Sequence, residues 1–238
     1  MRDLLDRRLV FGGDIIPAYF ASAPAIIKPK RKMQTTQIPG SNREVVDMED
    51  AWEPYEQPYE MFVYGEDYDS INELMDEVLM LLNKSGWQTL VDEYDTDHFR
   101  LACFEGALDS DNRSTRMGKF SVKFKCRPER FLVSGNIGVN VPTGNSLINP
   151  TVYKAKPLIH VEGIAGGTLT IGSTTITFTD IDDYLNVDCD TMNVYRLPSE
   201  NKNSLMEGDY PVLKSGENIV SFTGGITSVT ITPRWFVI

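Results

Sequence analysis

The densest group of residues able to do chemistry is the acidic stretch DIDDYLNVDCD, residues 180–190. Carboxylates spaced this closely can bind a divalent cation or act as a general acid and base. The stretch also alternates polar and apolar residues, which predicts a strand whose polar face carries Asp188 and Asp190 on either side of Cys189. A solvated strand face is therefore favoured over a ligand site. The members of this candidate ligand cluster are Asp180, Asp182, Asp183, Asp188 and Asp190.

A second polar group, Asp109, Asp111 and Asn112, is similar to the start of a calcium-binding loop. The glycine and the distal glutamate of an EF-hand loop are missing from the residues that follow. Asn112 also opens an Asn-Arg-Ser glycosylation sequence, which matters only for a secreted chain. The composition of DSDNRSTRMG instead predicts a long, solvated hairpin loop.

The other reactive residue types are sparse and far apart. Neither His98 nor His160 has a sequence neighbour that would form a base–nucleophile pair, and Cys103, Cys126 and Cys189 fit neither a zinc pair nor a disulfide framework. The glycines of EGIAGGT precede a strand pattern, and no Walker, GxSxG or HExxH motif occurs. The sequence predicts no catalytic residue, no metal site and no cofactor, and therefore no enzyme.

The elements that must position these residues begin with one amphipathic helix, predicted over 70–85. Ser70 and Glu73 fit a capping box, and Lys84 followed by Gly86 closes the segment. The apolar residues that repeat at helical spacing are Ile71, Leu74, Met75, Val78, Leu79 and Leu82.

Elsewhere the apolar residues alternate. EMFVYG and FRLACF are short strands, and GKFSVKFKCRP is a longer one with Val122, Phe124 and Cys126 on one face. A shift towards Gly, Asn, Ser and Pro in residues 134–150 predicts two domains, 1–139 and 140–238. Only strand patterns and turns follow this shift, which is typical of a β-sandwich, so the fold class is mainly β.

Two hairpins are predicted in the second domain. Gly172-Ser173 is a two-residue turn that pairs Leu169 and Ile171 with Ile176 and Phe178, and Gly224-Gly225 joins NIVSF to ITSVTITPRWFVI. Pro233 cannot donate a ladder hydrogen bond, so SVTIT completes the sandwich and RWFVI bends away. We expect Trp235 to be buried at the junction with the first domain, where it fixes the angle between the two.

Composition and charge exclude several partners. With 34 acidic against 23 basic residues, the chain has a net charge of −11, which opposes stable binding to phosphate backbones. The basic run KPKRK, residues 28–32, is a solvated loop face rather than a nucleic-acid arm, because no aromatic residues are interleaved with it. No apolar run reaches the length that spans a bilayer, and the opening MRDLLDRRLVFGGD has no signal-peptide core, so synthesis in the cytoplasm without membrane association is expected.

Four stretches carry a family resemblance, in this order along the chain: GWQTLVDEYDTDHFRLACFEG with the preceding helix, KFSVKFKCRPERF, NPTVYKAKPLIHVEGIAGGTLTIGSTTITF, and YLNVDCDTMNVY through GDYPVLKSGENIVSFTGGITSVTITPRW. Together they resemble the distal tail proteins, or Dit, of long-tailed, non-contractile phages (siphophages). The resemblance covers most of the chain from about Ser70 onward.

The resemblance implies a structural virion protein of the phage tail tip, or baseplate hub. Its N-terminal domain would form a homohexameric ring, and its C-terminal domain would be a galectin-like or carbohydrate-module-like β-sandwich. The ring would join the tail-tube protein to the tail-tip hub protein and serve as a docking platform for adhesion proteins; the tape measure and a receptor-binding protein are further partners. DNA would pass through the channel without stable binding, kept from adhering by carboxylates that face the lumen.

A host-saccharide-binding module of the tail tip is the alternative function. Sugar rings stack on exposed aromatic side chains. The candidates in the second domain are Tyr153, Tyr184, Tyr195, Tyr210 and Trp235, which are scattered along the sequence.

Overall fold

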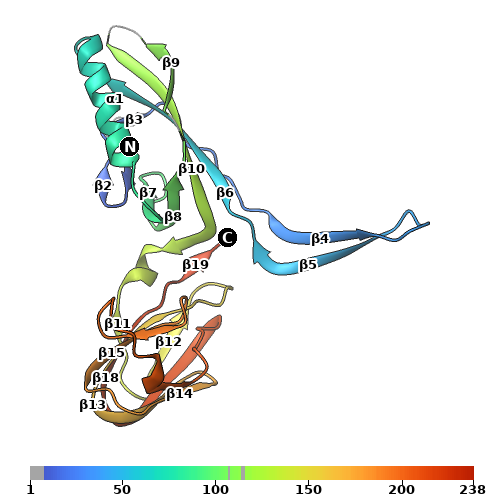
Figure 1. Cartoon of the computed structure of the whole chain (residues 1–238), viewed down its shortest axis with the longest axis vertical. Coiled ribbons are helices and arrows are strands. Elements are labelled where there is room, and N and C mark those ends of the chain that lie inside the picture. The colour runs from blue at the N-terminus through green and yellow to red at the C-terminus, as the bar shows by residue number, and fades with distance from the viewer. Residues whose placement is uncertain (1–7, 107, 114–115) are drawn as a thin grey trace. The chain divides into compact units, whose positions relative to one another are not determined.

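The computed structural model describes residues 8–106, 108–113 and 116–238 and is mainly β, with one α-helix among these residues, α1 (Tyr68–Leu82) (Figure 1). The chain divides into two compact units: Met1–Arg130 together with Ile238, and Phe131–Val237. Among the described residues, no helix has the length and apolar content that crossing a membrane requires.

The first unit is built on a sheet with the strand order β2-β1-β7-β8-β10-β6-β3, and β9 also pairs with β10. The strand β10 confirms the predicted alternation, because Val122, Phe124 and Cys126 are buried while Lys123 and Lys125 are exposed. The strands of this sheet are β1 (Leu9–Phe11), β2 (Asp14–Ile15), β3 (Tyr19–Phe20), β6 (Tyr55–Tyr64), β7 (Gln88–Asp92), β8 (His98–Phe104), β9 (Asp109–Arg113) and β10 (Met117–Leu132).

Helix α1 packs its apolar stripe into the core of this unit, through Ile71, Met75, Val78 and Leu82. The predicted capping box was wrong. The N-cap is Asp67, whose carboxylate accepts from Ser70 N at 2.9 Å while Asp67 N donates to Ser70 Oγ at 3.0 Å. Aspartate is as good an N-cap as serine, so the helix begins before the serine that was read as its cap.

Two strand predictions in the first unit also need correction. The strand β6 begins at Tyr55 and includes Pro58, whereas the sequence predicted only the shorter strand EMFVYG, residues 60–65. Pro58 is tolerated because β3 pairs with β6 at Met61 and Phe62, away from the proline. Part of the predicted loop DSDNRSTRMG is the strand β9, which pairs with β10 at its edge. The side chains of the calcium-like group 109–112 and Ser114 of the glycosylation sequence lie outside the described residues.

A two-stranded arm, formed by β4 (Arg31–Gln37) and β5 (Glu44–Trp52), runs away from the sheet of the first unit (Figure 1). The two strands pair antiparallel, from Arg31 opposite Trp52 to Gln37 opposite Glu44. Nearly all of its side chains are exposed. The basic run 28–32, predicted as a loop, therefore continues into a strand at Arg31.

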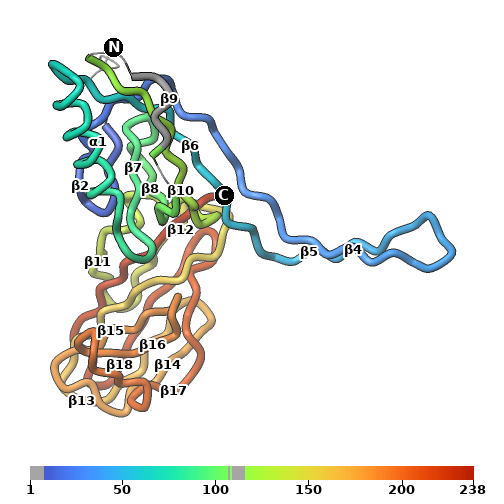
Figure 2. Tube along the Cα trace, turned by 45° about the horizontal axis from the view of Figure 1, so that its top comes forward, coloured from blue at the N-terminus to red at the C-terminus, as the bar shows by residue number. Residues whose placement is uncertain are grey.

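The second unit is organised by two long strands, β13 (Leu158–Ile171) and β18 (Gly216–Thr232), which pair antiparallel along their length (Figure 2). The first half of β13 also pairs with β15 and the second half with β14, so the two halves of the ribbon share one apolar core. The shorter strands are β11 (Val139–Asn140), β12 (Ser146–Asn149), β14 (Thr174–Phe178), β15 (Asp183–Asp188), β16 (Asn193–Tyr195), β17 (Met206–Gly208) and β19 (Phe236–Val237).

The predicted hairpin at Gly172-Ser173 is confirmed, with Leu169 opposite Ile176. The rest of the predicted pairing was wrong, because Ile171 lies opposite Thr174 and Phe178 lies opposite Gly167. The predicted hairpin at Gly224-Gly225 is wrong, because β18 continues through both residues. A Cβ atom on Gly225 would lie 2.6 Å from the carbonyl oxygen of Ala165. These glycines therefore permit a close approach of β18 to β13 where the ladder changes register, and they do not form a turn.

The boundary between the compact units falls at 130/131, whereas the composition shift placed the domain boundary at 139/140. The intervening residues include a 3-10 turn, Val133–Asn136, and β11. They belong to the second unit because Val139 pairs with Ile231 of β18 and Gly135 packs closely against Trp235.

Candidate functional site

The acidic cluster predicted from residues 180–190 is dispersed in the structure. Asp182 and Asp183 occupy a turn with positive φ values, 44° and 85°, and Asp190 pairs with Lys156 at 3.2 Å. The described residues contain no group of three or more histidine, cysteine and acidic side chains arranged to hold a metal ion.

Arg196 holds this acidic turn. Its Nη2 donates to the carbonyl oxygens of Ile181 and Asp182, at 2.8 and 2.6 Å, and its Nε donates to that of Tyr184 at 3.2 Å. Left-handed backbone at two successive non-glycine residues is strained, so such bonds are needed to hold it. The arginine has a structural role at this turn.

Asp188 forms an ion pair with Arg234, through Oδ1–Nη1 and Oδ2–Nη2 contacts of 2.7 and 3.3 Å. Burial raises the pKa of Asp188, but the hydrogen bonds and the charge of Arg234 outweigh burial and hold the pKa below its usual value of 3.8. The carboxylate stabilises Arg234, whose φ is +58°, directly after Pro233.

We expect this pair to make the stability of the second unit depend on pH. A carboxyl group with a lowered folded-state pKa contributes fully above its unfolded pKa, and the contribution is lost as the pH falls through the lower, folded-state pKa. Asp188→Asn should therefore flatten the acid side of the stability profile, measured by urea unfolding between about pH 3 and pH 7. The control is Glu217→Gln, an exposed position on β18. An unchanged slope for Asp188→Asn would contradict this assignment.

Trp235 and Pro233, predicted as junction residues, are both buried. The strand β18 ends at Thr232, immediately before Pro233, as expected. Trp235 is 5% exposed and belongs to the apolar core of the second unit, and its carbonyl oxygen accepts a hydrogen bond from Leu132 N at 2.9 Å. That Trp235 also fixes the angle between the domains stays a prediction.

The aromatic residues considered for saccharide binding are largely engaged by neighbours. Tyr153 stacks on Phe236 with ring centroids 5.3 Å apart, and Tyr184 lies 5.2 Å from the ring of His160. Tyr210 packs against the core, and Trp235 is part of it. The half-buried Tyr195 is on the short strand β16, so these five residues form no shared stacking platform.

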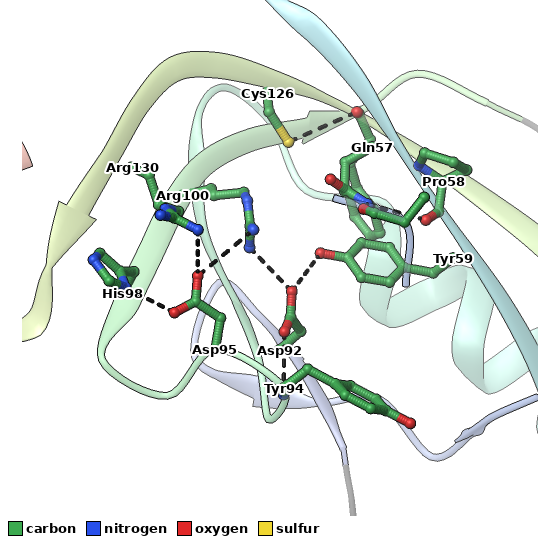
Figure 3. A network of polar contacts seen from close by, with 12 residues as sticks. Gln57, Pro58, Tyr59, Asp92, Tyr94, Asp95, His98, Arg100, Cys126 and Arg130 are labelled. Carbon is green, nitrogen blue, oxygen red and sulfur yellow. Dashed lines mark hydrogen bonds and ion pairs between the residues drawn. The ribbon is translucent and has the colours of Figure 1, made fainter. Parts of the chain in front are cut away.

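The most elaborate polar site lies in the first unit, and no sequence motif predicted it. Asp92 is 2% exposed and Arg100 is 9% exposed, and Asp92 Oδ2 lies 3.0 Å from both Arg100 Nη1 and Tyr59 Oη (Figure 3). Arg100 Nε donates to Tyr55 Oη at 3.2 Å. Because paired strands bring these side chains together, no local motif could reveal them.

Asp95 extends the network towards the surface. Arg130 Nη1 lies 3.0 Å from Asp95 Oδ2, Arg100 Nη2 lies 3.8 Å from the same oxygen, and His98 Nδ1 lies 2.7 Å from Oδ1 (Figure 3). The turn between β7 and β8 places both aspartates, because Asp95 N donates to Asp92 O at 3.1 Å. His98 is thus a partner of this network, and its Nδ1 contacts the carboxylate of Asp95.

Burial and charge shift the pKa values of the network in a consistent way. Burial raises the pKa of Tyr59 well above its usual value, and Asp92 raises it further. Burial lowers the pKa of Arg100, but Tyr59, Tyr55 and Asp92 more than reverse this effect. Burial also raises the pKa of Cys126 to about 12, which leaves that thiol protonated and unreactive at neutral pH. These shifts keep Arg100 charged and Tyr59 protonated at neutral pH.

Comparison with known proteins agrees with the fold. Residues 18–126 match the model of the phage tail protein RIFT-related domain. The structure of the Dit protein of phage SPP1, described as a paradigm of the hub adsorption apparatus in phages that infect Gram-positive bacteria, matches with a TM-score of 0.70 at 12% sequence identity, over 98% of this chain and 99% of that chain.

Two structures of the phage P2 baseplate in its activated conformation, with calcium and with strontium, each match with a TM-score of 0.57 at 9% identity, over 94% of this chain and 97% of the baseplate chain. Among curated proteins, none matches the sequence. The chain is thus similar to a phage tail protein domain over residues 18–126 and shares its fold, over nearly the whole length, with the Dit protein of phage SPP1.

Proposed function

We propose that the chain assembles into a homohexameric ring that joins the tail tube to the tail-tip hub and provides a docking platform for adhesion proteins. The role is structural and involves no catalysis. The observation that carries the proposal is the two-stranded arm of the first unit, which has the properties of an element that is completed by a neighbouring subunit.

The arm exposes apolar side chains on one face. Met48 pairs with Met33, and Val46 pairs with Thr35, so Met33, Val46 and Met48 share that face, and all three are exposed. An isolated two-stranded hairpin is marginally stable in water, and exposed strand edges invite pairing with another chain. A second copy of the chain that covers Met33, Val46 and Met48 would remove both liabilities.

A heterologous contact of this kind, in which the arm of each copy packs on a different surface of the next copy, produces a closed ring when the rotation between neighbouring copies closes on itself. Such a ring leaves its other faces available for the tail tube on one side and the hub on the other. The net charge of −11 supports passage of DNA through the ring without adhesion, because like charges repel the phosphate backbone.

The test is the mass of the purified full chain by light scattering, with electron microscopy of the same sample. We expect a species with six times the chain mass of 26.8 kDa and a visible central channel. The triple variant Met33→Ser, Val46→Ser, Met48→Ser should shift the population to monomers. The matched control is Met80→Ser, an exposed methionine on α1, which should leave the hexamer intact.

A wild-type chain that remains monomeric at high concentration, and that is missing from the tip of intact tails, would overturn the proposed function. If the hexamer survives the triple substitution, the proposal of a ring would stand, but the arm would not be part of the interface between subunits.

A further inference from the structure

Two methionines lie opposite each other on the arm formed by β4 and β5. Met33 and Met48 are paired across the two strands, so their side chains share one face, and these residues are 63% and 58% exposed. Directly opposed residues on one face of an antiparallel pair have Cβ atoms about 5 Å apart. The two thioether side chains therefore form one exposed, polarisable patch.

Other methionines of the chain provide a scale for this exposure. Met80 on α1 and Met192 in the turn between β15 and β16 are 69% and 65% exposed, and Met61 in the core of the first unit is 1% exposed. Met33 and Met48 are thus about as accessible as the most exposed of these residues. Their distinguishing property is their position, because they lie on the face of the arm that a second copy would cover.

An exposed thioether is open to oxidation by hydroperoxides. The sulfur lone pair attacks one peroxide oxygen, the O–O bond breaks, and that oxygen stays on sulfur as a sulfoxide. Its proton passes to the departing oxygen, which leaves hydrogen peroxide as water. The sulfoxide is polar, and burying a polar group without a partner is destabilising. Oxidation would therefore act on the arm as the serine substitutions of the triple variant do.

We propose that Met33 and Met48 form an oxidation site that determines whether a chain enters the ring. In the free chain both thioethers react with hydroperoxide, and the resulting sulfoxides block assembly. In the ring the neighbouring copy covers both side chains and protects them. A chain oxidised before assembly is thereby excluded, whereas an assembled ring resists the same oxidant. This inference rests on the proposed ring and on the place of the arm in its interface.

The first test measures the oxidation of each methionine. Monomer and hexamer fractions of the full chain, separated by size, are treated with hydrogen peroxide and mapped by peptide mass spectrometry. In the monomer, Met33 and Met48 should react at rates similar to those of Met80 and Met192. In the hexamer, Met33 and Met48 should react at least tenfold more slowly, while Met80 and Met192 react at unchanged rates and provide the internal reference.

The second test asks whether oxidised chains assemble. Peroxide-treated monomers should stay monomeric in light scattering. Methionine sulfoxide reductase with dithiothreitol should restore the hexamer, because two thiols become a disulfide while the sulfoxide oxygen leaves as water.

Two double variants locate the effect. Met33→Leu, Met48→Leu keeps apolar side chains of similar volume, so it should assemble and should still assemble after peroxide treatment. The matched control Met80→Leu, Met192→Leu should assemble when untreated and should lose the hexamer after peroxide treatment, as the wild-type chain does. Both variants retain Cys103, so this comparison separates thioether oxidation from thiol oxidation.

The outcomes distinguish this proposal from the proposed ring. Hexamers that form equally well from oxidised chains, or in which Met33 and Met48 react as fast as Met80, would overturn the oxidation site and leave the ring standing. Peroxide sensitivity that persists in Met33→Leu, Met48→Leu would do the same. An untreated chain that never assembles would overturn the ring and this proposal together.

Discussion

Replacing Arg100 by methionine is expected to lower the free energy of unfolding of the first unit by about 3–5 kcal/mol, the usual cost of removing one partner of a buried ion pair. The loss arises because Asp92 is almost completely buried and would lose the guanidinium that lies 3.0 Å from its carboxylate. The Tyr55 hydroxyl, 3.2 Å from Arg100 Nε, would lose its donor as well. Urea unfolding, followed by far-ultraviolet circular dichroism and analysed with one transition for each unit, measures the change.

Two controls separate the buried charge from simple loss of volume. The double variant Asp92→Asn, Arg100→Met should be more stable than Arg100→Met, because it leaves no unpaired charge. Lys125→Met removes the cation of an exposed pair, 3.4 Å from Glu105, and should cost about 1 kcal/mol or less. A cost of that small size for Arg100→Met would show that water reaches Asp92 and that the network is not a stabilising element.

The strongest periodic patterns predicted their elements well. The alternation around Val122 and the helical stripe from Ile71 to Leu82 each record burial of one face against a core, and a local sequence window contains that information. The hairpin at Gly172-Ser173 was predictable for the same reason, since both strands and the turn lie within about a dozen residues.

The elements that the sequence could not reveal depend on contacts between distant strands. Gly224-Gly225 has the composition of a turn, and only the approach of Ala165 from β13 explains why both glycines lie within a strand. In the sequence, Asp92 and Arg100 are ordinary polar residues on either side of a turn. Their network is completed by Tyr59, which comes from another strand and donates a hydrogen bond to Asp92. The acidic run 180–190 was interpreted as a solvated strand face rather than a ligand site, and in the structure its carboxylates pair separately with Arg234, Arg196 and Lys156.

Trp235→Ala is expected to cost about 3–5 kcal/mol of stability in the second unit, as for other large aromatic residues in a core. Trp235 is nearly fully buried and packs so closely on Gly135 that a Cβ atom there would lie 2.5 Å from Trp235 N. Arg234, whose backbone is left-handed, donates its N–H to Gly135 O at 2.7 Å, so the tryptophan also helps to hold a strained turn. The cost would therefore include both a cavity and the loosening of this turn.

The control for this variant is Trp87→Ala, a partly exposed tryptophan of the first unit whose ring lies 5.1 Å from Arg127, and we expect it to cost about 1 kcal/mol. If Trp235→Ala left the unfolding of the second unit unchanged, its place in that core would be refuted. The same measurement tests the junction prediction, because a tryptophan that serves only its own core should lower the transition of the second unit alone. A shift of both transitions in Trp235→Ala, absent in Trp87→Ala, would show that this residue couples the two units, and the first unit would then depend on the core of the second unit for its stability.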